Sequence, residues 1–134
     1  MAELTQQEHE QLREMTEVAW VNACMAKEGD AAAAMCTEDV DYMPADLPLL
    51  KGRAAVSDFL NEFPELVAFH QKLVSVEGDT SLAVARVTFG GSFVVDGQEL
   101  SAVGKGLATA TMDSGSWLFS AVCWNWDAPP APSE

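Results

Sequence analysis

The chain has 134 residues, of which 49% are hydrophobic, and its 21 acidic and 7 basic side chains give a formal net charge of −14. This length allows one domain with a sizeable core and leaves no room for a second. The negative charge disfavours nucleic acid and membrane surfaces as partners, because both are anionic and bind through clustered Lys and Arg.

The opening residues have neither a basic head nor an apolar stretch, and no apolar run in the chain approaches about 18 residues. We therefore expect a cytoplasmic protein without a secretory signal or a membrane segment. The three cysteines, Cys24, Cys36 and Cys123, are too scattered for a disulfide framework or a zinc site. All three are predicted to be small buried hydrophobic residues.

The first half of the chain has the pattern of helices. A capping box opens at Thr5, and the helical spacing of apolar residues after it predicts a helix over residues 5–28. Gly29 is expected to close this helix. Asp30 then caps a short second helix over residues 31–36.

A short strand and a third helix follow. Alternating polar and apolar residues over 39–43 predict a strand that stops at Pro44. The next residues form a loop up to Gly52, after which helical spacing resumes until Pro64 ends the third helix.

From Ala68 onward the pattern alternates with the period of a strand. Turn signals separate the extended segments, which indicates an antiparallel meander, and helices followed by such a meander predict the α+β class. Internal glycines imply bulges or bends that curl the sheet. We expect a single domain over residues 1–127 and a flexible, Pro-rich tail over residues 128–134. The four segments are 69–77, 82–95, 100–112 and 117–126, and the glycines are Gly90, Gly91, Gly104 and Gly106.

Short segments spread over nearly the whole chain carry a resemblance to a known family. They are Ala19-Trp20, Glu28-Gly29-Asp30, 37–44, 52–56, Gly104-Lys105-Gly106-Leu107, Gly115-Ser116-Trp117 and Trp124-Asn125-Trp126-Asp127. In this order they resemble the nuclear transport factor 2-like superfamily, and within it the SnoaL-like, or ketosteroid isomerase-like, group. The resemblance implies a cone-shaped, cystatin-like α+β fold with N-terminal helices packed against a curved antiparallel sheet. It also implies a homodimer through the outer face of the sheet, but no single activity, because the superfamily hosts many.

Ketosteroid isomerase chemistry needs a carboxylate base and two oxyanion donors, a phenol and a protonated acid. Aligned with this sequence, the base position falls at Pro44, the tyrosine at Trp20 and the acid at Leu107. With two residues of freedom in the register, Asn22 replaces Trp20 and Asp46 is the acid nearest the missing base. Because the set is incomplete, steroid double-bond isomerisation is not expected.

The remaining chemistry-bearing residues are few. His9 and His70 are both expected to face solvent, so neither a metal site nor a hydrolase triad is predicted, and no cofactor is expected. Strand alternation also points Arg86 outward. Lys105 has two readings. It is either a buried ammonium that binds an anionic ligand or acts as a base, or a rim cation paired with Asp127 or Glu99.

The sequence predicts an apolar pocket for a small hydrophobic ligand, in one of two kinds of protein. The first is an isomerase-, cyclase- or dehydratase-type enzyme that moves a proton on a hydrophobic carbonyl compound, with Asp46 as base and Tyr42 or Trp20 as oxyanion donor. The second is a non-catalytic dimerisation or protein-interaction module whose cone is filled by side chains. An open pocket of about a few hundred Å³ favours the first. The predicted lining residues are Trp20, Tyr42, Phe59, Phe63, Phe89, Lys105, Leu107 and Trp124.

Overall fold

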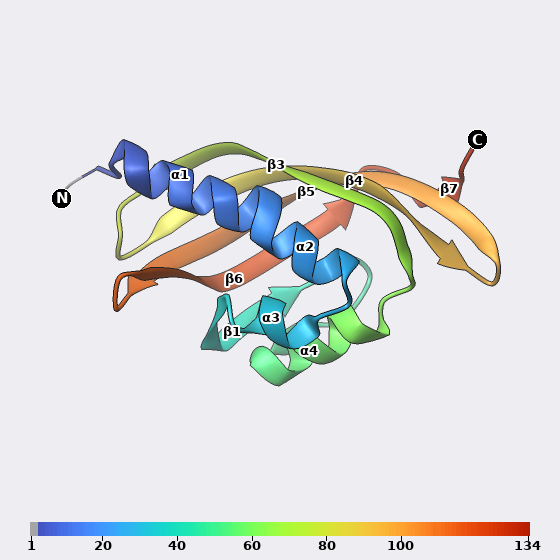
Figure 1. Cartoon of the computed structure of the whole chain (residues 1–134), viewed down its shortest axis with the longest axis horizontal. Helices are drawn as coiled ribbons and strands as arrows, with labels where there is room; N and C mark the ends of the chain where they lie inside the picture. Colours follow the sequence, from blue (N-terminus) through green and yellow to red (C-terminus); the bar gives the residue numbers. More distant parts are fainter. Residues whose placement is uncertain (1–2) are drawn as a thin grey trace.

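A computed structural model describes residues 3–134 of the chain. Its helices come first in the sequence, as predicted. An almost continuous N-terminal helix lies along one face of the sheet, and two shorter helices lie together at one side of the molecule (Figure 1). The helical elements are α1 (Gln6–Glu14), the π-helix η1 (Met15–Ala19), α2 (Trp20–Met25), α3 (Gly29–Ala33) and α4 (Arg53–Glu62).

The strands form one curved sheet of order β2-β1-β6-β5-β4-β3, in which β1 and β6 are parallel and the other neighbours are antiparallel. The four long strands are those predicted, each within three residues of its expected ends. The α+β prediction, with helices against a curved sheet rich in antiparallel pairs, is confirmed. The strands are β1 (Cys36–Met43), β2 (Leu50–Lys51), β3 (Leu66–Gly78), β4 (Ala83–Val95), β5 (Gln98–Asp113), β6 (Ser116–Trp126) and β7 (Ala131–Pro132).

The start of the first helix is as predicted, and its end is not. The main-chain N–H of Thr5 donates to the Glu8 carboxylate at 2.8 Å, and the N–H of Glu8 donates to the Thr5 hydroxyl at 3.1 Å, which completes the capping box. The helix ends at Met25, and Lys27, with φ +54°, makes the turn that Gly29 was expected to make. Gly29 instead begins α3.

The reason for a glycine at position 29 is close packing. A Cβ on Gly29 would lie 2.4 Å from the main-chain oxygen of Ser57, so α3 and α4 can approach only because the side chain is absent. The second helix is shorter than predicted, and Cys36 is already the first residue of β1.

The π-helical turn is matched by an irregularity in the strand beside it. In β3 the register with β4 shifts between Leu73 and Ser75. The N–H of Leu73 donates to the Glu17 carboxylate at 2.8 Å, and the Gln71 side-chain amide donates to the main-chain oxygen of Thr16 at 2.8 Å. The main-chain oxygen of Thr16 in η1 and the N–H of Leu73 in β3 therefore both find hydrogen-bond partners across the contact between the two elements.

The glycines of the central strands do not mark bulges, which was one of the two predicted roles, although the sheet is curved as expected. The β4–β5 register runs without a shift through Gly90, Gly91, Gly104 and Gly106, and the bulges lie in β3 and between β5 and β6. The role of Gly104 is spatial, because a Cβ there would lie 2.4 Å from the Phe89 ring. The glycine lets an aromatic ring lie flat across the neighbouring strand.

The C-terminal segment is attached to the sheet, whereas the sequence suggested a loose tail. Pro132 and Ala131 of β7 pair with Leu100 and Ser101 of β5, and the N–H of Ser133 donates to the main-chain oxygen of Glu99. Three prolines do not prevent this pairing because it is short and lies at an edge.

The core lies between the N-terminal helix, α4 and the concave face of the sheet. Leu12, Val40, Val56 and Cys36 are its largest fully buried side chains. Cys24 is also buried, but Cys123 is exposed on β6, so one of the three cysteines departs from the prediction. None of the helices within residues 3–134 is long and apolar enough to cross a membrane.

Candidate functional site

A cavity of about 110 Å³ lies between the N-terminal helix, α4 and the concave face of the sheet. Its wall is almost entirely apolar, because strand alternation directs every second side chain of β3 to β6 toward the helices. Ten aromatic residues line it: Trp20, Tyr42, Phe59, Phe63, Phe69, Phe89, Phe93, Phe119, Trp124 and Trp126.

Six of these rings form a closed circuit of contacts. Neighbouring ring centroids in the circuit are 5.4–6.3 Å apart, and most pairs meet edge to face or at a tilt. Each ring of the circuit therefore packs against two others. In order the circuit is Phe59, Phe63, Phe93, Trp126, Phe89 and Trp124.

The first polar group of the cavity is the hydroxyl of Tyr42. The indole Nε1–H of Trp124 donates to this oxygen at 2.9 Å, which fixes its position. Because the indole can only donate, the phenol keeps its own proton for another acceptor. Burial raises the pKa of Tyr42, and the hydrogen bond from Trp124 offsets part of that rise. At neutral pH the group is therefore an uncharged hydrogen-bond donor.

A second polar group comes from η1 and β3. Thr16 and Gln71 both line the cavity. The hydroxyl of Thr16 is buried without a hydrogen-bond partner among the described residues. The amide nitrogen of Gln71 is held by the main-chain oxygen of Thr16, which leaves the amide oxygen as an acceptor.

The ionisable groups at the cavity do not bring charge into it. Burial raises the pKa of the Cys24 thiol from 9.0 to about 12, so this thiol is protonated at neutral pH. Lys27 is exposed, and its ammonium donates to the main-chain oxygens of Asn61 and Phe63 at the end of α4. No Asp, Glu or His of the described residues lines the cavity, and residues 3–134 contain no group of three or more His, Cys, Asp or Glu that could hold a metal ion.

The structure brings most of the predicted pocket residues together. Leu107 touches the cavity but is 47% exposed on the outer face of the sheet. Since Gly106 and Ala108 also line the cavity, alternation directs the Leu107 side chain away from it. The predicted residues that line the cavity are Trp20, Tyr42, Phe59, Phe63, Phe89, Leu107 and Trp124.

Lys105 does not line the cavity, which corrects its predicted place there. It lies on the outer face of β5, where its ammonium is 2.8 Å from the carboxylate of Asp127 and both side chains are about half exposed. The pair agrees with the second interpretation of Lys105, a cation at the rim that pairs with Asp127 or Glu99. Arg86, expected to face outward, does so and pairs with Glu77 at 2.6 Å.

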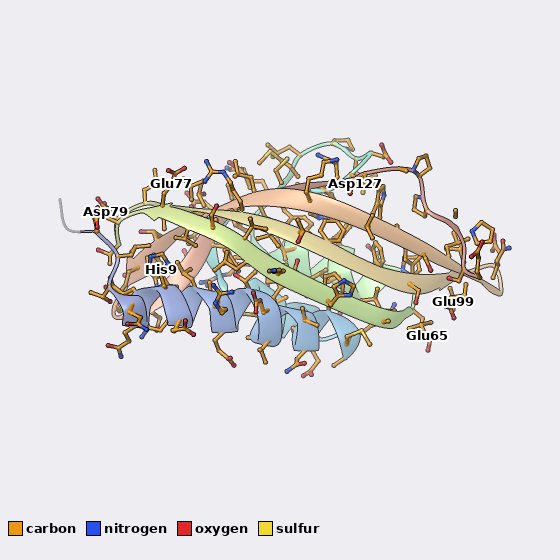
Figure 2. The ribbon with its side chains drawn as sticks, turned by 90° about the horizontal axis from the view of Figure 1, so that it is seen from above. His9, Glu65, Glu77, Asp79, Glu99 and Asp127 are labelled. Carbon is orange, nitrogen blue, oxygen red and sulfur yellow. The ribbon has the colours of Figure 1, made fainter. Side chains whose placement is uncertain are left out.

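Asp46, the predicted base, is exposed on the loop after β1 and has φ +62°. It is not among the cavity-lining residues, so the structure does not bring it to Tyr42. Figure 2 shows Glu77 and Asp79 toward one end of the strands and Glu65 and Glu99 toward the other. Of the two histidines, His70 is exposed as expected, whereas His9 is half-buried.

Sequence reasoning missed several lining residues, some of which had a signal. Phe93 and Trp126 have the same strand parity as Phe89 and Trp124, so alternation could have added both to the predicted wall. Thr16 had no such signal, because the π-turn that positions it is not visible in the spacing of apolar residues.

Comparison with known proteins gives a family match over most of the chain. The model described as a SnoaL-like domain matches residues 18–118. No curated protein matches the chain significantly by sequence.

The fold has many solved counterparts of low sequence identity. A ketosteroid isomerase-like protein from Erwinia carotovora atroseptica has a TM-score of 0.75 and 19% identity, over 84% of this chain and 91% of that one. An NTF2-like protein with a cystatin-like fold from Novosphingobium aromaticivorans has a TM-score of 0.72 and 18% identity, over 92% and 84%. A proposed scytalone dehydratase from the same organism has a TM-score of 0.79 and 15% identity, over 96% and 89%.

Proposed function

The chain belongs to the SnoaL-like domain family, and from this premise we propose that it binds a small, uncharged aromatic compound that carries a hydrogen-bond acceptor. One observation carries the proposal. The Tyr42 hydroxyl is fixed by Trp124 and keeps a free proton inside a wall of aromatic rings. A carbonyl oxygen on the ligand would accept a hydrogen bond from the Tyr42 hydroxyl.

The size of the cavity supports a single-ring ligand. Its volume of about 110 Å³ is below the roughly 150 Å³ of an apolar protein cavity known to bind benzene, so a substituted ring would extend into the mouth of the cavity, where the lining residues Lys27 and Cys123 are exposed. It is smaller than the pockets of about 300 Å³ and more that hold drug-sized molecules. The circuit of aromatic rings supplies edge-to-face and offset-stacked partners for a planar molecule.

The charge of the wall supports an uncharged ligand. A charged ligand would lose its hydration in the cavity, and the lining offers no carboxylate to pair with a cation. Within residues 3–134 the lining ammonium is that of Lys27, which is already engaged by two carbonyl oxygens at the surface.

The geometry favours binding over catalysis by proton transfer. A general base must lie within hydrogen-bond reach of the proton it removes, directly or through one water. Asp46 lies outside the lining, and the lining thiol of Cys24 is protonated at neutral pH. The cavity of about 110 Å³ is smaller than the few hundred Å³ expected of an open pocket, so its volume alone does not decide against a non-catalytic interaction module, and the proposal depends on the polar groups of the lining.

Calorimetric titration with two matched probes tests the proposal. Acetophenone carries the carbonyl acceptor, and ethylbenzene has nearly the same shape without it. We expect acetophenone to bind about fivefold more tightly, the worth of one neutral hydrogen bond. Tyr42→Phe removes only the hydroxyl and should abolish that preference, whereas Thr88→Val on the exposed face of β4 should keep it. Equal affinities for both probes in the wild type, or no binding of either, would contradict the proposal.

We also propose that two copies of the chain associate through the outer face of the sheet. Val103 and Leu107 on β5 are 57% and 47% exposed there. Exposed aliphatic side chains in the middle of a sheet are typical of a surface that another chain covers. This proposal is independent of the ligand.

A further inference from the structure

We propose that the cavity recognises its ligand at two opposite ends, and that the ligand is therefore an aryl ketone with a hydroxyl group para to the carbonyl. This rests on the proposed function, because the carbonyl end is the one that Tyr42 binds. The hydroxyl end is bound by Gln71 and Thr16, residues of β3 and η1.

The amide of Gln71 is oriented before any ligand binds. A carbonyl oxygen can accept only from the nitrogen of the amide, so the 2.8 Å contact with the main-chain oxygen of Thr16 fixes which end of the amide is which. The amide oxygen is thereby left as an acceptor at the cavity. It suits a hydroxyl or N–H donor on the ligand and repels a second carbonyl.

The hydroxyl of Thr16 complements this acceptor. Thr16 lines the cavity, is only 2% exposed, and its Oγ1 has no hydrogen-bond partner within residues 3–134. A buried hydroxyl without a partner costs about 1–3 kcal/mol, so a bound group that satisfies it gains affinity. Threonine in a helix takes two χ1 rotamers, which allows the oxygen to turn toward such a group.

A ligand hydroxyl fits both residues at once. It donates a hydrogen bond to the Gln71 amide oxygen and accepts a hydrogen bond from the Thr16 hydroxyl. A ligand carbonyl satisfies only Thr16, and a ligand amine satisfies mainly Gln71. The pair of residues therefore selects a hydroxyl.

The two polar ends lie on opposite walls. Tyr42 is on β1 and Gln71 is on β3, and in the sheet order β2-β1-β6-β5-β4-β3 these strands are separated by β6, β5 and β4. The sheet is curved, and the N-terminal helix lies along it (Figure 1). The turn η1 of that helix holds Thr16 and contacts β3. A single ring that reaches both ends must carry its polar groups at opposite positions.

Three probes separate this inference from the proposed function. They are acetophenone, 4′-hydroxyacetophenone and 3′-hydroxyacetophenone, each titrated calorimetrically into the wild type, Thr16→Val, Gln71→Met and Tyr42→Phe. Thr16→Val conserves shape and removes a hydroxyl that has no partner, so it should not lower stability.

We expect the 4′-hydroxy probe to bind the wild type about tenfold more tightly than acetophenone, and the 3′-hydroxy probe no more tightly than acetophenone. Thr16→Val and Gln71→Met should each reduce the ratio of 4′-hydroxyacetophenone affinity to acetophenone affinity at least threefold, whereas Thr88→Val on the exposed face of β4 should leave both affinities unchanged. A 4′-hydroxy preference that is absent, or that survives both substitutions, overturns the inference. If acetophenone itself shows no dependence on Tyr42, the proposed function fails instead.

Discussion

At the scale of single residues, the interior of the protein holds three weak acids in their uncharged forms. Burial raises the pKa of the Cys24 and Cys36 thiols from 9.0 to about 12, and Arg53 offsets part of the rise at Cys36. Burial raises the pKa of Tyr42 as well. In alkaline solution each of these groups can ionise only by placing a negative charge in an apolar environment, which is why its pKa is raised.

The sign of the resulting pH dependence follows from proton counting. Between about pH 9 and pH 12 the unfolded chain has lost the Cys24 proton and the folded chain keeps it. The stabilisation is fully present below pH 9 and is lost as the pH rises, at about 1.4 kcal/mol per pH unit for each such group.

We predict that Cys24→Ala flattens this alkaline decline. The free energy of unfolding of the variant, measured by urea denaturation from pH 8 to pH 11, should fall by about 1.4 kcal/mol less per pH unit above pH 9 than that of the wild type. Cys123→Ala removes an exposed thiol and is the matched control, whose slope should equal that of the wild type. Identical slopes for Cys24→Ala and the wild type would show that the thiol is not buried in solution.

At this scale strand parity accounts for the outward side chain of Arg86, whereas the sequence left two interpretations for Lys105 and put Asp46 at a cavity that it does not line. Strand alternation identified Phe89, because parity is fixed by the backbone, whereas Trp124 was identified through the family resemblance. Alternation also places Lys105 on the outer face, opposite to Gly104 and Gly106, yet an apolar neighbourhood in the sequence suggested the pocket. Asp46 depended on the register of a loop, which no spacing rule determines.

At the scale of elements, the contact between η1 and β3 is held by a carboxylate. Glu17 accepts from the N–H of Leu73 at 2.8 Å and pairs with Arg13 at 3.0 Å. The exposed ion pair contributes little, whereas the loss of an acceptor for a part-buried N–H costs about 1–3 kcal/mol.

We predict that Glu17→Ala lowers the free energy of unfolding by about 2 kcal/mol, and that Glu17→Gln, which keeps an acceptor, loses less than half of that. Glu14→Ala is the control for the removal of one negative charge from an acidic protein, since Glu14 is exposed. Urea denaturation at neutral pH measures all three variants. A loss as large in Glu14→Ala as in Glu17→Ala would contradict the role given to the carboxylate.

The packing of β4 on β5 depends on a position where no side chain fits. A Cβ on Gly104 would lie 2.4 Å from both the main-chain oxygen of Asn125 and the ring of Phe89. We predict that Gly104→Ala destabilises the protein by about 3 kcal/mol. Gly97→Ala, at a turn with φ +78° and no atom within 4 Å, should cost only about 1 kcal/mol of backbone strain.

The double variant Gly104→Ala with Phe89→Leu identifies which contact matters. Part of the loss should be recovered if the ring is the obstacle, because the smaller side chain leaves room for the new methyl group. The midpoint of thermal unfolding is measured for the wild type, Gly104→Ala, Gly97→Ala and the double variant. Equal losses for Gly104→Ala and Gly97→Ala would argue against the close contact.

The elements themselves were largely predictable, and their junctions were not. The capping box fixed the start of the first helix at Thr5, since it involves residues three apart. The end at Met25 could not be predicted, because Gly29 is required for contact with α4, a long-range constraint that local sequence does not contain. The register shift between Leu73 and Ser75 was not predictable for a similar reason, because it lies where β3 contacts the π-turn, far away in the sequence.

At the scale of the whole molecule, helices that precede a long meander predicted the α+β class from the order of the patterns, whereas the cone shape was predicted from the family resemblance. The free volume inside the cone could not be predicted, because it depends on how ten rings pack against one another. The chain has a net charge of −14. Carboxylates are labelled at both ends of the strands in Figure 2.

That charge makes the association of two copies dependent on salt. Two chains of charge −14 repel each other at low ionic strength, and the Debye length falls from about 30 Å at 0.01 M to about 3 Å at 1 M. If the outer face of the sheet is the interface, the dissociation constant measured by sedimentation equilibrium should fall as salt is added.

Leu107→Glu tests the place of the contact, because it puts a carboxylate on the exposed middle of β5 and should leave the protein monomeric at every salt concentration. Leu82→Glu adds the same charge at an equally exposed leucine next to the β3–β4 turn, so any difference between the two variants is due to position. Since Gly106 and Ala108, and not the Leu107 side chain, face the cavity, acetophenone should bind Leu107→Glu and the wild type with the same affinity. A Leu107→Glu protein that still dimerises places the interface elsewhere, and one that loses acetophenone would show that the two faces of the sheet are not independent.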